Sequence, residues 1–324
     1  MREVIDECIQ KAKDSGKFSA VIIGTTARMD SCSFVIAPNK ESDKCVGSSF
    51  IIRNYNDFKA ICQYADGKAD YFFIDAEAKI DATFDLVAEA GSCIKRSKMK
   101  TFKGNDITAL ACDLLVSEMI GDLRGKKVSI IGAGNIGSKM ALKSVERGAN
   151  VFITRRDDRG ELIAEAMNTI KNRYSIGRVY SEKNASKCAD KADVLIGFTQ
   201  GYPVIDEQIT ASLSNHALII DGGVGTITEG AIACAKQLGL TILRLDIRIA
   251  FPYVMDSILS TEHFIEKIAG TITADDGTYV AGGYIGGIGD IVVDQIHAPT
   301  KIIGIADGKG GIQHYHNKKF NRNK

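Results

Sequence analysis

Three glycines with the spacing G-x-G-x-x-G are the residues of this sequence whose pattern most directly indicates chemistry. They are Gly132, Gly134 and Gly137, and Asn135 and Ile136 lie between them. The first glycine permits a tight turn, the second lets the backbone approach a pyrophosphate, and the third lets a helix pack closely on a strand. The phosphates then bind to N–H groups at the N-terminus of that helix. We expect these five residues to bind a dinucleotide cofactor.

The elements around the glycines supply the context that this motif needs. A strand is predicted from Val128 to Ile131, a helical pattern ends at Gly148, and a second strand is predicted from Val151 to Thr154. This β-α-β order is what separates a dinucleotide fingerprint from a chance match. It disfavours the alternative interpretation, a glycine-rich turn in some other α/β unit.

The end of the second strand bears on the choice of nicotinamide cofactor. An acidic side chain there serves the ribose hydroxyls of NAD, whereas a basic one accommodates the 2′-phosphate of NADP. The chain offers Thr154, Arg155 and Arg156. Because the arginine fork binds phosphate bidentately and stacks on adenine, these three residues predict NADP. Asp157 keeps NAD possible. The remaining interpretation is that both arginines are only solvated surface charges.

Further strands are predicted downstream, at Val194–Ile196, before Asp221 and at Thr241–Asp246. Loops at the carboxyl ends of strands line the ligand crevice of a doubly wound sheet. Thr199 and Gly201 lie in such a loop and are predicted to flank the cofactor. The strand count predicts a Rossmann-type domain over residues 107–282, in which 247–282 has no assigned role.

Strands that alternate with helical segments fill the first hundred residues and predict an α/β substrate domain over residues 1–106. Asp106 opens a further helix, either as its N-cap or as a side chain that a loop delivers into a cleft between two domains. A basic run from Lys95 to Lys103 is interpreted as a solvated edge rather than an anion site. The expected strands are 19–24, 34–37, 49–53 and 71–75, and the expected helices are 1–17 and 55–64.

The composition bounds the class of protein. With 324 residues, 45% hydrophobic and 25% charged, the chain suits two globular domains. A net charge of +1 argues against nucleic acid or an anionic membrane as a partner. The first helix lacks the apolar core of a signal peptide and no run is long enough to span a bilayer, so we expect a cytoplasmic protein. Eight scattered cysteines predict buried thiols, and no metal site is predicted, because His314 and His316 lack further ligands.

Taken together, these motifs give the sequence a resemblance to the shikimate/quinate dehydrogenase family of the amino-acid-dehydrogenase-like two-domain proteins. The family's serine loop is similar to Ser31-Cys32-Ser33, and its catalytic lysine corresponds to Lys79. Its asparagine-threonine-aspartate turn is similar to Gly104-Asn105-Asp106. The family's cofactor signature is similar to Thr154-Arg155-Arg156, and its aspartate strand is similar to the strand that ends at Asp221. The family also has a glycine-led helix with a substrate-contacting glutamine, which is similar to Gly287-Ile288-Gly289 with Gln295.

The resemblance implies hydride transfer between a nicotinamide and a small hydroxy or keto substrate. Lys79 would be the acid/base, with Asp106 as its partner, since burial and a nearby cation lower the pKa of a lysine toward neutrality. The substrate pocket departs from the family, because Asp75 stands where a substrate-binding threonine is expected. Asp75 or Glu77 then favours a polar substrate other than shikimate. The implied substrate contacts are Ser31, Ser33, Asp75, Asn105 and Gln295.

The resemblance also implies that residues 283–324 return to the first domain and that the protein is a homo-oligomer. Two other functions stay open. A methylene-tetrahydropterin dehydrogenase shares the architecture, and Tyr64 and Lys68 have the Y-x-x-x-K spacing of some folate enzymes. A non-catalytic NADP-binding regulatory protein would keep the cofactor half alone, and Lys79 and Asp106 would then be a surface lysine and a helix cap.

Overall fold

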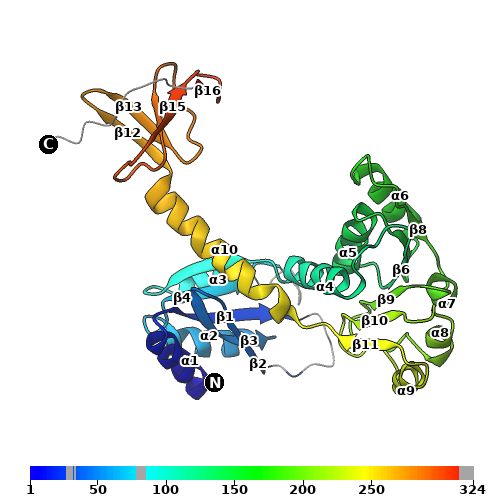
Figure 1. Ribbon diagram of the computed structural model, residues 1–324. Coiled ribbons are helices and arrows are strands. Elements are labelled where there is room, and N and C mark those ends of the chain that lie inside the picture. The colour runs from blue at the N-terminus through cyan, green and yellow to red at the C-terminus, as the bar shows by residue number, and fades with distance from the viewer. Residues whose placement is uncertain (27–31, 33, 78–84, 314–324) are drawn as a thin grey trace. The chain divides into compact units, whose positions relative to one another are not determined.

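The computed structural model of this chain describes residues 1–26, 32, 34–77 and 85–313. The chain forms two compact units, Met1–Val254 and Met255–Lys324 (Figure 1). The first unit contains two α/β sheets and the second contains a small β-sheet. The predicted fold class, an N-terminal α/β part followed by a Rossmann-type part, is confirmed.

The first sheet has the strand order β2-β3-β1-β4-β5, in which β2 is antiparallel and the other strands are parallel. Its central strands are almost entirely buried apolar residues, as expected of parallel strands covered on both faces. The strands are β1 (Phe18–Thr25), β2 (Phe34–Glu41), β3 (Cys45–Ile52), β4 (Tyr71–Asp75) and β5 (Lys98–Phe102). The basic run predicted as a solvated edge therefore includes the edge strand β5.

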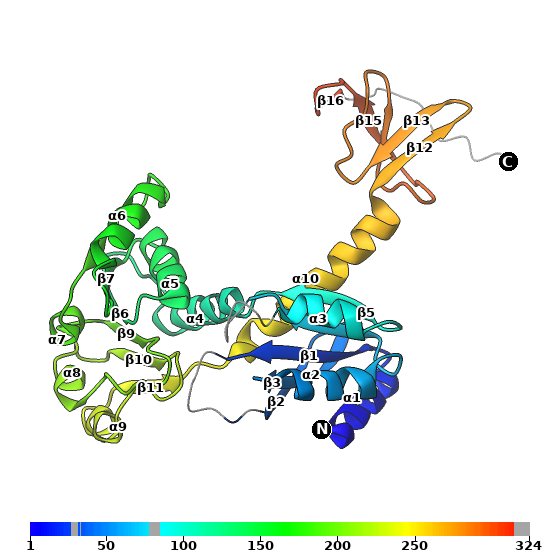
Figure 2. The same ribbon diagram turned by 180° about the vertical axis from the view of Figure 1, so that it is seen from behind.

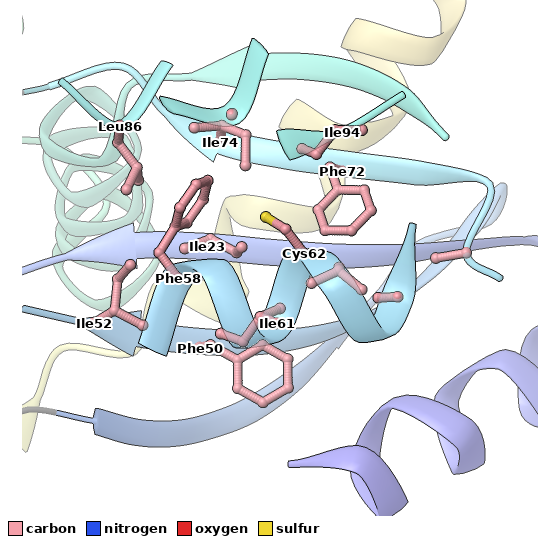
Figure 3. Close-up of a cluster of buried hydrophobic side chains, with 14 of the residues drawn as sticks. Ile23, Phe50, Ile52, Phe58, Ile61, Cys62, Phe72, Ile74, Leu86 and Ile94 are labelled. Atoms are coloured by element: carbon pink, nitrogen blue, oxygen red, sulfur yellow. The ribbon is translucent and has the colours of Figure 1, made fainter. Parts of the chain in front are cut away.

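Helices α1 (Arg2–Asp14), α2 (Tyr55–Ala65) and α3 (Leu86–Cys93) accompany this sheet (Figure 2). The amphipathic face of α2 carries Phe58, Ile61 and Cys62 onto the buried side chains of the strands (Figure 3). Asn54 caps α2 by accepting a hydrogen bond from the amide of Asp57. The eight cysteines of the chain are thiols rather than disulfides, and five of them are buried, in agreement with the prediction.

The second sheet has six parallel strands in the order β11-β10-β9-β6-β7-β8. This is the order of a complete doubly wound Rossmann sheet, in which the strand order reverses between β6 and β9 and leaves a crevice there. The strands are β6 (Lys127–Ile131), β7 (Asn150–Thr154), β8 (Val179–Ser181), β9 (Val194–Gly197), β10 (Leu218–Asp221) and β11 (Thr241–Arg244). The helices are α5 (Asn135–Glu146), α6 (Gly160–Ile170), α7 (Ala185–Ala189), α8 (Glu207–Ala211) and α9 (Glu229–Gln237).

Helix α4 (Gly104–Ile120) leads from the first sheet to the second and packs along α5. The predicted domain boundary at residue 106 thus falls in the first turn of α4. An ion pair joins the two helices, because the guanidinium of Arg147, which is partly exposed, donates to both carboxylate oxygens of Asp113 at 2.7 and 2.8 Å. Asp113 itself is almost fully buried.

The carboxyl part of the chain corrects three predictions. Strands β12 (Gly270–Ala274), β13 (Gly277–Ala281), β14 (Ile291–Val293), β15 (Ile302–Ala306) and β16 (Ile312–Gln313) form one sheet in that order. The expected boundary at residue 282 falls inside this sheet. Residues 283–313 join the sheet through β14, which pairs with β13, and not through a strand of the first domain. Gly287 and Gly289 lead into strand β14, not into the helix that the resemblance implied. Before the sheet come α10 (Phe251–His263) and a short π-helix, η2 (Phe264–Ile268).

Candidate cofactor and active site

The loop from β6 to α5 has the geometry that its three glycines predict. Gly132 has φ of +100°, and a Cβ there would lie 2.5 Å from the carbonyl oxygen of Phe198. A Cβ on Gly137 would lie 2.4 Å from the carbonyl oxygen of Gly132, so a side chain would push α5 off the strand. A Cβ on Gly134 would meet nothing within 4 Å. The first and third glycines are therefore required by packing, and the second faces open space.

The N-terminus of α5 is open as well. Gly134 is its N-cap residue and, in the part of the chain that the structure describes, no side chain caps this helix end. The first N–H groups of a helix have no intrahelical partner and carry partial positive charge. Asn135 and Ile136 lie in this first turn, so their amides can bind the phosphates of a ligand.

A cavity of about 640 Å³ lies beside this loop, at the carboxyl ends of the second sheet's strands. That volume is of the size that accommodates a small-molecule ligand or cofactor. Its walls come from the β6–α5 loop, the segment after β7, the loop after β9 and the end of β8. The lining residues are Ile131, Gly132, Ala133, Gly134, Thr154, Arg155, Arg156, Asp157, Asp158, Lys183, Ala185, Phe198, Thr199, Gln200, Tyr202 and Val204.

The two predicted arginines play different parts in this cavity. Arg155 donates one guanidinium N–H to the carbonyl of Ala133 in the glycine loop, and it binds both carboxylate oxygens of Asp157 at 2.7 Å. Arg156 places its guanidinium 5.2 Å from the centre of the Tyr202 ring. Arg155 thus fixes the glycine loop to the end of β7, while Arg156 lies with Tyr202 in the lining of the cavity.

Asp157 is held by a second arginine. Arg159 donates its backbone N–H to Oδ1, and Nε and Nη2 to Oδ2, at 3.2, 3.0 and 2.6 Å. Hydrogen bonds from Arg155, and then from Arg159, hold the pKa of Asp157 far below its ordinary value. A carboxylate offers about four lone-pair positions. Since Asp157 already accepts five hydrogen bonds from two residues, it has no lone pair left for a ribose hydroxyl.

The loop after β9 forms the facing wall. Thr199 donates its hydroxyl to the carbonyl of Tyr202 at 2.5 Å, and Gly201 has φ of +87°. Sequence reasoning missed several residues of the cavity, among them Phe198, Gln200 and Tyr202 in this loop and Lys183 after β8. The first three adjoin the predicted Thr199 and Gly201, so the loop itself was a usable signal. Nothing in the sequence around Lys183 indicated the cofactor site.

A second group of charged residues lies at the carboxyl edge of the first sheet. Asp75 ends β4 and is buried, and its Oδ1 accepts hydrogen bonds from the amides of Glu77 and Gly104 at 3.2 and 3.1 Å. Oε2 of Glu77 accepts from the amide of Asn105 at 2.5 Å. Asp75 and Glu77 thus bind the first two amides of α4.

Lys139, which sequence reasoning did not select, connects this group to α5. Its ammonium forms ion pairs with Asp106 and, at 3.5 Å, with Glu77. Lys103 pairs with the other oxygen of Asp106 at 3.0 Å. The hydrogen bond from Lys139 is the largest influence that lowers the pKa of Asp106, so this carboxylate stays ionised at neutral pH. Asp106 is in the first turn of α4 and is not its N-cap, which is Lys103.

The remaining predicted residues cannot be compared with this geometry. Lys79, Ser31 and Ser33 lie outside the described residues. Gln295 belongs to the second unit, where its side-chain amide donates to the carbonyl of Ala298 at 2.9 Å. His314 and His316 also lie outside the described residues. Among the residues that are described, no cluster of three or more histidine, cysteine and acidic side chains is arranged to hold a metal ion.

Comparison with known proteins agrees with the fold of the second sheet. Residues 127–225 match the family model described as NADP oxidoreductase, coenzyme F420-dependent. A glutamyl-tRNA reductase of Thermosipho melanesiensis is 29% identical over 145 residues, which cover 42% of this chain and 36% of that protein. The chain thus matches about a third of that relative's length. These matches and the strand order define a protein with an NAD(P)-binding Rossmann domain of the oxidoreductase type.

Two solved structures are also similar to this chain. A dipicolinate synthase from Bacillus halodurans has a TM-score of 0.39 at 14% identity, over 76% of this chain and 97% of that one. L-tryptophan dehydrogenase from Nostoc punctiforme has a TM-score of 0.45 at 14% identity, over 76% of each chain. Separately, none of the helices in the described ranges combines the length and apolarity needed to cross a membrane.

Proposed function

We propose that this chain is an NADP-dependent oxidoreductase that transfers a hydride between the nicotinamide and a small polar hydroxy or keto substrate. The observation that carries the proposal is the open N-terminus of α5 beside a cavity of about 640 Å³ whose lining includes arginine and lysine side chains. The helix end suits the pyrophosphate. The nicotinamide, when bound, supplies or accepts the hydride.

The preference for NADP over NAD is argued from the end of β7. An NAD site needs an acidic side chain with free lone pairs for the ribose hydroxyls. Asp157 does not meet that need, because Arg155 and Arg159 already use its oxygens. Arg156 and Lys183 line the cavity and offer donors to a 2′-phosphate, although Lys183 also pairs with Asp158 of the lining at 2.7 Å. Charge-assisted hydrogen bonds of this kind are stronger than neutral ones.

The test of the cofactor is a titration of the protein with NADPH and NADH by calorimetry. We expect Arg156→Ala to weaken NADPH binding about 10- to 100-fold, the loss of one or two charge-assisted hydrogen bonds, and to leave NADH binding nearly unchanged. Arg173→Ala removes an exposed arginine that does not line the cavity, and it is the matched control. Equal affinity for both cofactors that Arg156→Ala does not alter would overturn the assignment to NADP.

The proposed chemistry needs a proton donor or acceptor beside the substrate oxygen. Asp106 is ionised and paired with two lysines, so it suits the orientation of a cation or a hydroxyl better than the donation of a proton. We assign the proton transfer to Lys79, which follows Glu77 by two residues in the sequence. Lys139 positions Asp106 and Glu77 at the same edge.

Turnover of a substrate panel tests the reaction. The panel contains hydroxy and keto acids, polyols and shikimate as the family-level expectation, and methylene-tetrahydropterin as the alternative. Glutamyl-tRNA is included because of the named relative, and coenzyme F420 is tried as an electron partner because of the family model's name. Lys79→Ala is expected to abolish turnover of the identified substrate, with NADPH affinity kept. NADPH binding without turnover of any substrate would instead favour the non-catalytic regulatory protein.

A further inference from the structure

The loop that follows strand β10, residues 222–226, contains one residue in a strained backbone conformation. Val224 has φ of +56°, in the left-handed region that glycine favours. Among the described residues, it is the only β-branched residue with a positive φ. The two heavy atoms on its Cβ make this region costly for valine, so the residue is a genuine outlier. Strained residues of this kind cluster at active sites and ligand-binding loops.

Hydrogen bonds to the last residue of β10 hold the loop in this conformation. One carboxylate oxygen of Asp221 accepts the amide of Gly225 at 2.7 Å. The other accepts the amide and the hydroxyl of Thr226, at 3.3 and 2.9 Å. Thr226 is fully buried, so these bonds are protected from water. The loop cannot relax the strain at Val224 without breaking them.

The other flank of Val224 packs closely on the loop after β9. A Cβ on Gly222 would lie 2.2 Å from the ring of Phe198, and a Cβ on Gly223 would lie 3.2 Å from the amide nitrogen of Thr199. Close packing therefore favours glycine at these two positions. At Val224 the chain instead carries a branched side chain, although glycine would relieve the strain. That side chain is 38% exposed, so core packing repays little of the strain, and contact with a ligand would explain it.

The place of the loop in the second sheet indicates which part of a cofactor it would meet. A doubly wound sheet consists of two mononucleotide-binding halves and binds a dinucleotide across the crevice between them. The glycine loop and the arginines after β7 belong to the half that is proposed to bind the pyrophosphate and the adenosine. Strand β10 lies beside β9 in the other half (Figure 1). Val224 adjoins the loop after β9, which lines the cavity, on the side where the nicotinamide would extend.

We propose that the side chain of Val224 forms an apolar wall of the nicotinamide subsite. This inference rests on the proposed function, because it needs a nicotinamide cofactor. Cofactor sites are lined mainly by apolar side chains, and the faces of the nicotinamide ring are apolar. A β-branched side chain suits the role, because its restricted χ1 fixes the position of the wall. The wall would orient the ring for hydride transfer, a step whose rate depends on the geometry of the reacting atoms.

The test compares two ligands by calorimetry. One is NADPH, and the other is 2′-phospho-ADP-ribose, which lacks only the nicotinamide. We expect Val224→Gly to weaken NADPH binding about tenfold, which corresponds to the loss of one buried valine side chain. Binding of 2′-phospho-ADP-ribose should stay unchanged. The midpoint of urea denaturation should not fall, because glycine adopts a positive φ without strain.

Two further variants separate the side chain from the flexibility of the loop. Asparagine tolerates the left-handed conformation, so Val224→Asn keeps the backbone of the loop but removes the apolar surface. It should weaken NADPH binding as much as Val224→Gly does. Val224→Ile keeps a β-branched apolar side chain, and its affinity for NADPH should stay close to that of the wild type.

His216→Gly is the matched control. His216 also has a positive φ, of +68°, but it is exposed in the turn before β10, at the opposite edge of the sheet. Its replacement relieves the same kind of strain and should leave both affinities unchanged.

The two ligands also separate a failure of this inference from a failure of the proposed function. An equal loss of affinity for both ligands in Val224→Gly would overturn the inference, because the effect would then lie in the half of the site that both ligands use. Unchanged NADPH binding in Val224→Gly and Val224→Asn would overturn it as well. If the wild type binds neither ligand, the proposed function fails, and this inference fails with it.

Discussion

Helices α4 and α5 each begin at the carboxyl edge of a sheet, but the chain treats the free N–H groups at their N-termini in opposite ways. At α4 the chain supplies its own anions, since Asp75 and Glu77 accept the amides of Gly104 and Asn105. At α5 the chain supplies glycines and, among the residues that the structure describes, no capping side chain. Both helix ends begin with N–H groups that lack an intrahelical partner and carry partial positive charge. The ligand site that we propose is therefore at the helix N-terminus where no carboxylate caps the helix in the described part of the chain.

The largest expected effect comes from Gly132→Ala. The residue has φ of +100°, and its Cβ would lie 2.5 Å from a backbone oxygen, so the β6–α5 loop must move. We expect a loss of about 3 kcal/mol or more in the free energy of unfolding, together with loss of NADPH binding. Urea denaturation measures the first and calorimetry the second. Gly91→Ala, at a helical glycine whose Cβ would meet nothing within 4 Å, is the control. Equal stability of the two variants would show that the loop is not constrained as described.

Gly134→Asp would make α5 resemble α4. The backbone of Gly134 is extended and its Cβ direction is open, so aspartate fits and can cap the helix. We expect the free energy of unfolding to stay within about 0.5 kcal/mol of the wild type, because glycine and aspartate differ little as caps. NADPH affinity should fall at least about 100-fold, because a carboxylate would occupy the phosphate position. Gly134→Asn, which caps without charge, should lose less. Unchanged affinity in Gly134→Asp would place the pyrophosphate elsewhere.

Asp75 tests the opposite case, a helix end that the chain itself satisfies. Asp75→Ala leaves the amides of Gly104 and Glu77 without their buried acceptor and should cost about 2 to 3 kcal/mol in urea denaturation. Asp75→Asn keeps a side-chain oxygen and should cost less than about 1 kcal/mol. Kinetics then separate capping from substrate binding. An Asp75→Asn variant that is stable but has a strongly raised KM would show that the charge contacts substrate.

The smallest effect is expected at the ion pair of Lys139 with Asp106. The side chains are 32% and 44% exposed, so solvent screening limits the contribution of the pair to less than about 1 kcal/mol. The pKa of Asp106 is lowered in the folded state, chiefly by Lys139. Its contribution is therefore present above the unfolded pKa of about 4 and is lost as pH falls through the lower folded value.

The measurement is the difference in free energy of unfolding between the wild type and Asp106→Asn. It should be constant from pH 7 to about pH 5 and shrink at lower pH, toward the depressed pKa. Asp122→Asn is the control, because Asp122 is a surface carboxylate that pairs with Arg124. It measures how the free energy of unfolding changes with pH when an ordinary solvent-screened ion pair is removed. A difference that grows as the pH falls would contradict the assigned direction of the pKa.

The sequence predicted the fold of the cofactor half closely because most of its signals are local. Gly137 packs on Gly132 and Ile130 of the same β-α-β unit, and Gly132 needs its positive φ whatever lies nearby, although its steric contact is with the distant Phe198. The strands around these glycines are buried apolar runs, which the hydrophobic pattern predicts. The end of the chain was predicted poorly for the converse reason. Gly287 and Gly289 matched a helical motif by residue type, but the residues after them pair with β13 and β15 and form the strand β14.

The sequence by itself therefore determined the Rossmann domain, the place of the glycine loop and the presence of arginines after β7. The tertiary structure decided what those charges do. Lys139 meets Asp106, which is 33 residues away, and Arg155 reaches back 22 residues to Ala133. Such pairs depend on how separate elements pack, and spacing along the chain does not encode that packing. The same holds for α4 and α5: both helix N-termini can be located in the sequence, but only the fold places carboxylates at one and leaves the other open.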